Sequence, residues 1–229
     1  MTEGEPPPPA DTQLRWARVL LGVGFLFSGV ALLGHLLAGI SLPLLLGLTG
    51  ALLTAVVAAA WLRLPADSRR LLWRVIVRGL AVALVATVLY DVSRAALALI
   101  DPSPFDPFAA WPIFGWLLLG RDAGADFALA AGVAFHVLNG LSFGLAYLLV
   151  FGRLALRSRR LALASGVGWG LFLEAFQVTL YPGWLSIAAY REFVTISALG
   201  HVVYGATLGL LGRRVLGGLD SIAEEPLDG

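Results

Sequence analysis

The 229-residue chain contains no cysteine, and all 16 of its basic residues are arginine, so lysine is absent as well. Without cysteine there is no disulfide, no thiolate ligand for a metal and no iron–sulfur cluster. Without lysine there is no Schiff base to retinal or pyridoxal phosphate, because both form on a lysine amine. Several large classes of cofactor chemistry are therefore excluded before any motif is considered.

Charged side chains are also scarce. They make up 14% of the chain, hydrophobic residues make up 59%, and the mean hydropathy is +0.84, whereas soluble domains have about 25% charged residues. A transmembrane helix needs about 20 consecutive apolar residues. The stretches of this length are 16–39, 43–62, 75–100, 126–151, 161–182 and 193–212. The sequence therefore predicts an all-α, polytopic transmembrane helix bundle with six spans.

Arginine is distributed unevenly among the segments that connect these spans. One set of segments contains Arg15, Arg18, Arg63, Arg69, Arg70, Arg74, Arg78, Arg153, Arg157, Arg159, Arg160, Arg213 and Arg214. The alternate segments have only Arg121 and Arg191. Since positive charge accumulates on the cytoplasmic side, both termini are predicted to be cytoplasmic, in the inner (plasma) membrane of a bacterium. The arginines are thus attributed to topology and anionic lipid, and no nucleic-acid partner is expected.

Polar segments flank a single predicted membrane domain at 14–216. Residues 1–13 contain four consecutive prolines and three acidic residues, a composition typical of a disordered tail. Residues 217–229 are also acidic, and both ends are predicted to be cytoplasmic tails. The loop at 101–125 places five aromatic residues among prolines, which predicts a periplasmic interfacial or re-entrant segment. It would either anchor in the membrane interface or cover a site that opens outward.

Ionisable residues within the spans are the main lead to function. An Asp or Arg at the centre of a membrane costs about 2.5–3.5 kcal/mol, so such groups face the bundle interior and pair. From a rise of about 1.5 Å per residue, four of them lie about 11–15 Å below the outer surface: Asp91, His136, Glu174 and His201. Each has a polar residue three positions later, on the same helical face: Arg94, Asn139, Gln177 and Tyr204. We predict that these eight residues form one polar cavity in the outer half of the bilayer.

A short pattern, His-x3-Gly-x3-Gly, occurs in the fourth span and again in the sixth. The residues are His136, Gly140 and Gly144 in one, and His201, Gly205 and Gly209 in the other. Small residues at this spacing let helix backbones approach closely, so the four glycines are predicted to mediate helix packing. The paired pattern resembles uncharacterised bacterial polytopic membrane proteins with a repeated histidine and glycine signature. The resemblance covers less than half of the chain and implies no activity.

Three functions fit the predicted cavity. The first is binding or passage of a small cation, a proton or a small polar solute, because imidazoles and carboxylates exchange protons and mark ion pathways. The alternative is a metal- or haem-binding membrane protein, redox or enzymatic, with a divalent metal on His136, His201, Glu174 and Asp91 or a haem between the histidines. The third is a scaffold subunit of a larger membrane complex. Either a homo-oligomer or such a complex is compatible with so few spans.

An enzymatic function is the less favoured interpretation. The run from Ser165 to Leu171, followed by His201, resembles the serine motif and later histidine of rhomboid proteases. The predicted topology places Ser165 near the cytoplasmic end of its span and His201 in the outer half of the next. A nucleophile and its base must lie within about 3 Å. The topology therefore argues against a serine hydrolase, and the sequence does not identify the ligand.

Overall fold

The computed structural model describes residues 10–100, 106–180 and 190–223. The helices are α1 (Ala10–Gly24), α2 (Phe27–Ala38), α3 (Leu42–Arg63), α4 (Ala66–Ile100), α5 (Ala110–Leu119), α6 (Ala125–Arg157), α7 (Arg159–Leu180) and α9 (Tyr190–Ala223). No strand occurs in these described ranges, and the predicted all-α class is confirmed. The predicted tails lie partly outside them, although α1 already begins at Ala10 and α9 continues to Ala223.

Five helices, α3, α4, α6, α7 and α9, are long and apolar enough to cross a membrane. The predicted first span is not one continuous helix. It consists of α1 and α2, which are bent by 41° at a short break and give a sixth crossing if the pair is counted as one span. At the break the Leu26 amide donates to the Val23 carbonyl, a tighter turn than the α-helical pattern. The apolar helices identify a multi-pass membrane protein.

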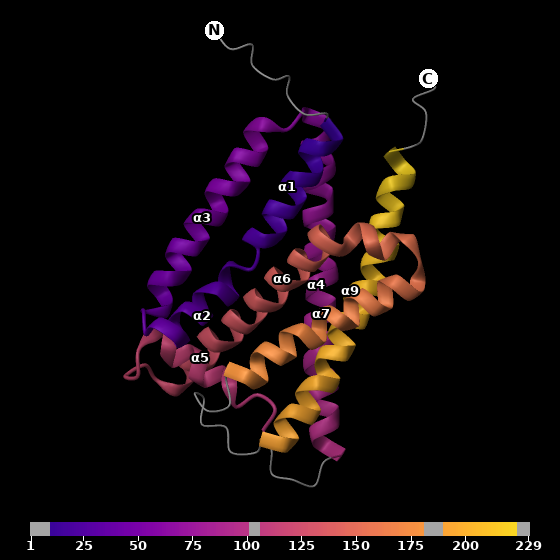
Figure 1. Cartoon of the computed structure of the whole chain (residues 1–229). Helices are drawn as coiled ribbons and strands as arrows, with labels where there is room; N and C mark the ends of the chain where they lie inside the picture. The colour runs from indigo at the N-terminus through magenta and orange to yellow at the C-terminus, as the bar shows by residue number, and fades with distance from the viewer. Residues whose placement is uncertain (1–9, 101–105, 181–189, 224–229) are drawn as a thin grey trace.

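The two ends of the described chain lie at the same end of the bundle (Figure 1). The start of α1, the junction of α3 with α4 and the end of α9 share this end, and the short helix α5 lies at the opposite one. The α3–α4 junction carries Arg63, Arg69 and Arg70. The arginines of the α3–α4 junction therefore lie at the end of the bundle that holds the two ends of the described chain.

Packing in the bundle centres on α6 and α9. Helix α9 packs against α4 and α7, while α6 packs against α4, α5 and α7. Helix α5 lies within the predicted loop 101–125 and fits closely on α6, because a Cβ on Gly115 would overlap the backbone of Ala128. Its 10 residues are too few to cross a bilayer. The described part of that loop is therefore helical and packed onto the bundle.

The glycine pairs lie where helices approach each other most closely. A Cβ on Gly205 would overlap the backbone of Gly166, and one on Gly209 would overlap the backbone of Ala162. The glycines of α9 therefore pack on α7. On α6, a Cβ on Gly140 would overlap the side chain of Thr87 in α4. Gly144 lies against Ala83 of the same helix. The two glycine pairs thus face different helices.

Candidate functional site

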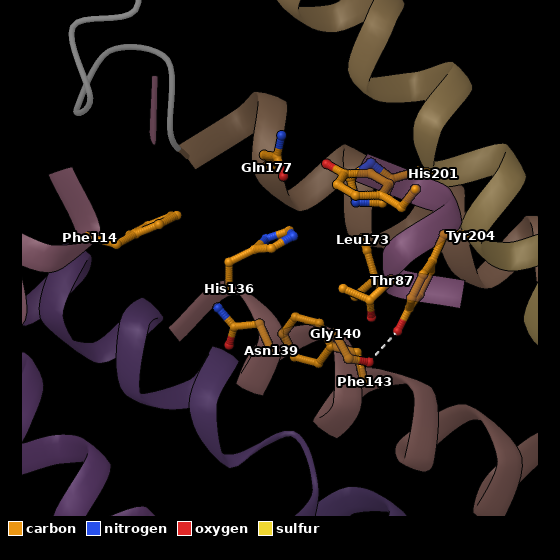
Figure 2. Close-up of a pocket in the computed structure, with 11 residues that line it drawn as sticks. Thr87, Phe114, His136, Asn139, Gly140, Phe143, Leu173, Gln177, His201 and Tyr204 are labelled. Atoms are coloured by element: carbon orange, nitrogen blue, oxygen red, sulfur yellow. Dashed lines mark hydrogen bonds between the residues drawn. The ribbon is translucent and has the colours of Figure 1, made fainter. Parts of the chain in front are cut away.

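A cavity of about 90 Å³ lies between α4, α6, α7 and α9, with α5 at one side. Figure 2 shows the side chains around it. The predicted residues that line it are His136, Asn139, Gln177, His201 and Tyr204. The other predicted residues lie close by: Arg94 lines a smaller adjoining cavity of about 30 Å³, and the two carboxylates lie behind the histidines. The structure therefore brings all eight predicted side chains into one neighbourhood.

His136 of α6 is held by Asp91 of α4. Its Nε2 lies 2.9 Å from one carboxylate oxygen and 3.1 Å from the other. Because an ionised carboxylate only accepts hydrogen bonds, Nε2 carries the proton and donates it to Asp91. The other ring nitrogen, Nδ1, has no hydrogen-bond partner among the described residues and is left as an acceptor in the neutral imidazole.

His201 of α9 pairs with Glu174 of α7, and this pair makes more hydrogen bonds to neighbouring residues than the His136 pair does. Its Nδ1 lies 2.8 Å from Glu174 Oε2 and 3.0 Å from the backbone oxygen of Ser197. Both of these oxygens are acceptors, so Nδ1 carries the proton and Nε2 is the acceptor of the neutral ring. The Ser197 hydroxyl donates to the same Glu174 oxygen at 2.7 Å and accepts from Gln177 Nε2 at 2.8 Å. Glu174 Oε2 therefore accepts from both His201 and Ser197, and Gln177 in turn binds the Ser197 hydroxyl.

Tyr90 of α4 joins the two imidazoles. Its ring centroid lies 4.8 Å from that of His201 and 5.9 Å from that of His136. The guanidinium of Arg94 lies 4.9 Å from the same ring, and it donates a hydrogen bond to the Pro107 carbonyl. Arg94 is buried, and none of the ion pairs among the described residues joins it to Asp91. Each carboxylate instead pairs with a histidine on a neighbouring helix.

The buried network contains more carboxylates than guanidinium groups. Among the described residues of this layer, Asp91 and Glu174 are acidic and Arg94 is the one arginine. The two histidines complete the layer, each with one ring nitrogen facing a carboxylate. Unbalanced charge in a medium of low dielectric constant is costly. Uptake of a proton by an imidazole, or of a cation by the cavity, would balance it.

Two acceptors have no partner although they are buried. Asn139 Oδ1 and Glu174 Oε1 make no hydrogen bond to the part of the chain that the structure describes. Buried polar atoms are almost always paired with protein or water, so each unpaired acceptor requires an explanation. Asn139 lines the cavity, although its Oδ1 is itself buried. Tyr204, in contrast, is fully used, because its hydroxyl donates to the Gly140 carbonyl at 2.6 Å, shown as the dashed line in Figure 2.

Sequence reasoning missed two aromatic residues of the site. Tyr90 contacts both imidazoles, and Trp111 of α5 lies 5.4 Å from the His136 ring, centroid to centroid. For Tyr90 a signal was present, since Thr87, Tyr90, Asp91 and Arg94 follow the i, i+3, i+4, i+7 spacing of one helical face. No comparable signal marked Trp111, which falls among the other aromatic residues of its loop.

The alternative sites predicted from the sequence receive less support from the geometry. No group of three or more His, Asp or Glu side chains that could hold a metal occurs within residues 10–100, 106–180 and 190–223. The four candidate ligands form two separate pairs, and Tyr90 contacts both histidines. Ser165 hydrogen-bonds the Tyr147 hydroxyl at 2.8 Å and the Leu161 carbonyl at 2.7 Å, while His201 pairs with Glu174. The expectation that Ser165 and His201 do not form a catalytic pair agrees with these contacts.

The chain was compared with known proteins at three levels. No family model, no curated protein and no solved structure matches it.

Proposed function

We propose that this protein binds a small cation or a proton in an intramembrane cavity and passes it toward the extracytoplasmic side. The observation that carries this proposal is the pair of carboxylate-backed imidazoles, His136 with Asp91 and His201 with Glu174, which line one cavity. Imidazole changes its charge near neutral pH, and intramembrane ionisable groups mark ion and proton pathways. The two carboxylates, with Arg94 as the one arginine in this layer of the described residues, favour a positively charged occupant.

The orientation in the membrane is part of the same proposal. The arginines of the α3–α4 junction lie at the end of the bundle that holds the two ends of the described chain (Figure 1). The positive-inside rule assigns this end to the cytoplasm of a bacterial inner membrane. The cavity lies on the side of α5, away from that end, and it would therefore open toward the periplasm.

Proton movement in liposomes tests the proposal. Purified protein is reconstituted with an entrapped pH-sensitive dye, and proton entry is followed under an imposed membrane potential, with and without Na⁺ or K⁺. We expect a flux above that of protein-free liposomes. Asp91→Asn and Glu174→Gln should each lower it about tenfold, which corresponds to a lost interaction of about 1.4 kcal/mol.

Asp67→Asn is the matched control for this experiment. Asp67 belongs to the same helix as Asp91, but its side chain is 90% exposed and pairs with Arg70. The flux of this variant should equal that of the wild type. Equal flux in Asp91→Asn, Glu174→Gln and the wild type would remove both carboxylates from the mechanism.

A divalent metal is the second candidate occupant, and one observation favours it. Histidines that bind metals usually donate their other ring nitrogen to a carboxylate or a backbone carbonyl, as both histidines do here. The acceptor nitrogens His136 Nδ1 and His201 Nε2 would be the ligands. Elemental analysis and an absorption spectrum of the purified protein decide between the two candidates. A stoichiometric metal, or the Soret band of a haem, would favour the cofactor function, and their absence would favour the cation function.

A further inference from the structure

A second, larger cavity of about 220 Å³ lies directly beside the polar one. One wall is formed by α2, including Val30 and Leu33, and the other by α7, including Phe172 and Phe176. We call this cavity the α2–α7 groove. Its only polar lining side chains within the described residues are Gln177 and His201. The groove is therefore apolar along its length and polar where it reaches the site.

The groove and the polar cavity are adjacent. Phe143, Leu173, Gln177 and His201 border both of them, so only side chains separate the two volumes. The groove is also open to the surroundings of the bundle, because Val30 of α2 is 54% exposed and Phe176 of α7 is 45% exposed. In a membrane these walls contact lipid chains. A molecule dissolved in the lipid could thus reach the histidines sideways, without crossing the water phase.

Charge and size restrict what such a molecule can be. The carboxylates of Asp91 and Glu174 behind the two histidines disfavour the anionic head of a fatty acid or a phospholipid. A polar cavity of about 90 Å³ is also smaller than the roughly 150 Å³ cavity that accommodates a benzene molecule, which argues for a compact head. The aromatic faces of Tyr90 and Phe114 line the polar cavity, and such faces attract organic cations.

Hydrogen bonding points to a primary ammonium group. Such a group has three donors and no acceptor. The polar cavity is lined by His136 and His201, and in the tautomers set by their carboxylates His136 Nδ1 and His201 Nε2 are acceptors. An ammonium head supplies donors of the kind that these acceptors require.

We infer that the site takes an amphipathic organic cation, a single-chain primary ammonium compound, whose head occupies the polar cavity while its chain lies in the α2–α7 groove. The inference rests on the proposed function, because it requires the cavity to bind a cation. It adds the chemical class of the ligand and its route, which is lateral entry from the bilayer between α2 and α7.

Calorimetric titration of the full-length protein in lipid nanodiscs, corrected with empty nanodiscs, tests this inference. The probes are decylammonium, methylammonium as the head alone, and decanesulfonate as an anionic molecule with the same chain. We expect decylammonium to bind at least about tenfold more tightly than methylammonium, and decanesulfonate not to bind above the empty-nanodisc level. Equal binding of decanesulfonate would overturn the assignment of a cationic head.

Val30→Trp tests the route. The larger side chain fills the mouth of the groove at a position that already faces lipid, so the fold should persist. We expect it to weaken decylammonium binding at least about tenfold and to leave methylammonium binding unchanged. The matched control is Val23→Trp on α1, which is 58% exposed and does not line the groove, and it should bind like the wild type.

The outcomes separate this inference from the proposed function. If Val30→Trp leaves decylammonium binding unchanged, or if both ammonium probes bind the wild type equally, lateral entry is wrong and the cation site stands. If neither ammonium binds but Asp91→Asn still abolishes proton flux, the ligand class is wrong and the proton pathway stands. If neither binds and flux is insensitive to both carboxylates, both proposals fail.

Discussion

The helix pairs α4–α6 and α7–α9 are built on the same plan, and their differences explain how the site is organised. In each pair one helix has the carboxylate, and the other has a histidine followed by two glycines at four-residue spacing. The glycines pack on the helix that carries the carboxylate partner of their own histidine: α6 packs on α4, and α9 on α7. Close helix packing and the imidazole–carboxylate contact therefore occur together in both pairs.

The two pairs differ in how tightly they are enclosed. The side chains of His136 and Asp91 are 17% and 22% exposed, whereas those of His201 and Glu174 are 10% and 6% exposed. Backbone meets backbone between α7 and α9, but the Gly140 contact between α6 and α4 involves a side chain. Ser197 and Gln177 further support Glu174, and Asp91 has no comparable support among the described residues. The same sequence pattern is therefore associated with a buried imidazole–carboxylate pair in α7–α9 and with a more exposed pair in α4–α6.

The largest effect is expected from removing the enclosed carboxylate. Glu174→Ala leaves the Ser197 hydroxyl without its carboxylate acceptor and removes the charge partner of His201, and breaking a buried pair costs about 3–5 kcal/mol. Asp91→Ala leaves a more exposed histidine, which costs about 1–3 kcal/mol. Thermal unfolding followed by circular dichroism in one lipid mixture should show the lower midpoint for Glu174→Ala. Asp67→Ala is the control, and equal shifts for the two carboxylates would contradict the comparison.

A smaller effect is expected from adding a methyl group to the glycines. The Cβ of Gly205→Ala meets the backbone of Gly166, which cannot move without separating α7 from α9, and overpacking costs about 1–3 kcal/mol. The Cβ of Gly140→Ala meets the Thr87 side chain, which can rotate away, so its cost should be lower. Gly168→Ala on α7 has nothing within 4 Å and should not lower the unfolding midpoint. A larger loss for Gly140→Ala than for Gly205→Ala would show that the α4–α6 contact is the tighter one.

The smallest effect concerns the histidine tautomers, that is, which ring nitrogen carries the proton, and it is measured by spectroscopy. The chain has 3 histidines, which makes nitrogen NMR of histidine-labelled protein simple to assign. In the neutral forms, His136 should carry its proton on Nε2 and His201 on Nδ1. His35 should also carry it on Nδ1, which lies 2.7 Å from the Ile40 carbonyl. Asp91→Ala should remove the preference at His136 alone. Identical tautomers at His136 and His201 would disprove the hydrogen-bonding scheme.

The sequence was sufficient to predict the all-α class and the long apolar helices, because these follow from apolar length. The sequence was not sufficient to predict which side chains contact each other. Arg94 and Asp91 are three residues apart on one helix, yet Arg94 packs on Tyr90 while Asp91 pairs with His136. The rotation of each helix about its axis decides this, and it depends on tertiary packing.

The break between α1 and α2 was also beyond sequence reasoning. The residues on both sides of the break are apolar, so hydropathy runs continuously through a change of direction of 41°. The α2–α7 groove was missed for a related reason. Its walls consist of residues such as Val30 and Phe176, whose composition is the same whether they face lipid or line a pocket. Only the arrangement of the helices distinguishes the two.

The glycine contacts also limit how the site can respond to an occupant. Since α7 and α9 touch through main-chain atoms, no change of rotamer can alter the separation of these two helices. The spacing between the backbones that carry Glu174 and His201 is thus set by main-chain contact and not by side-chain packing.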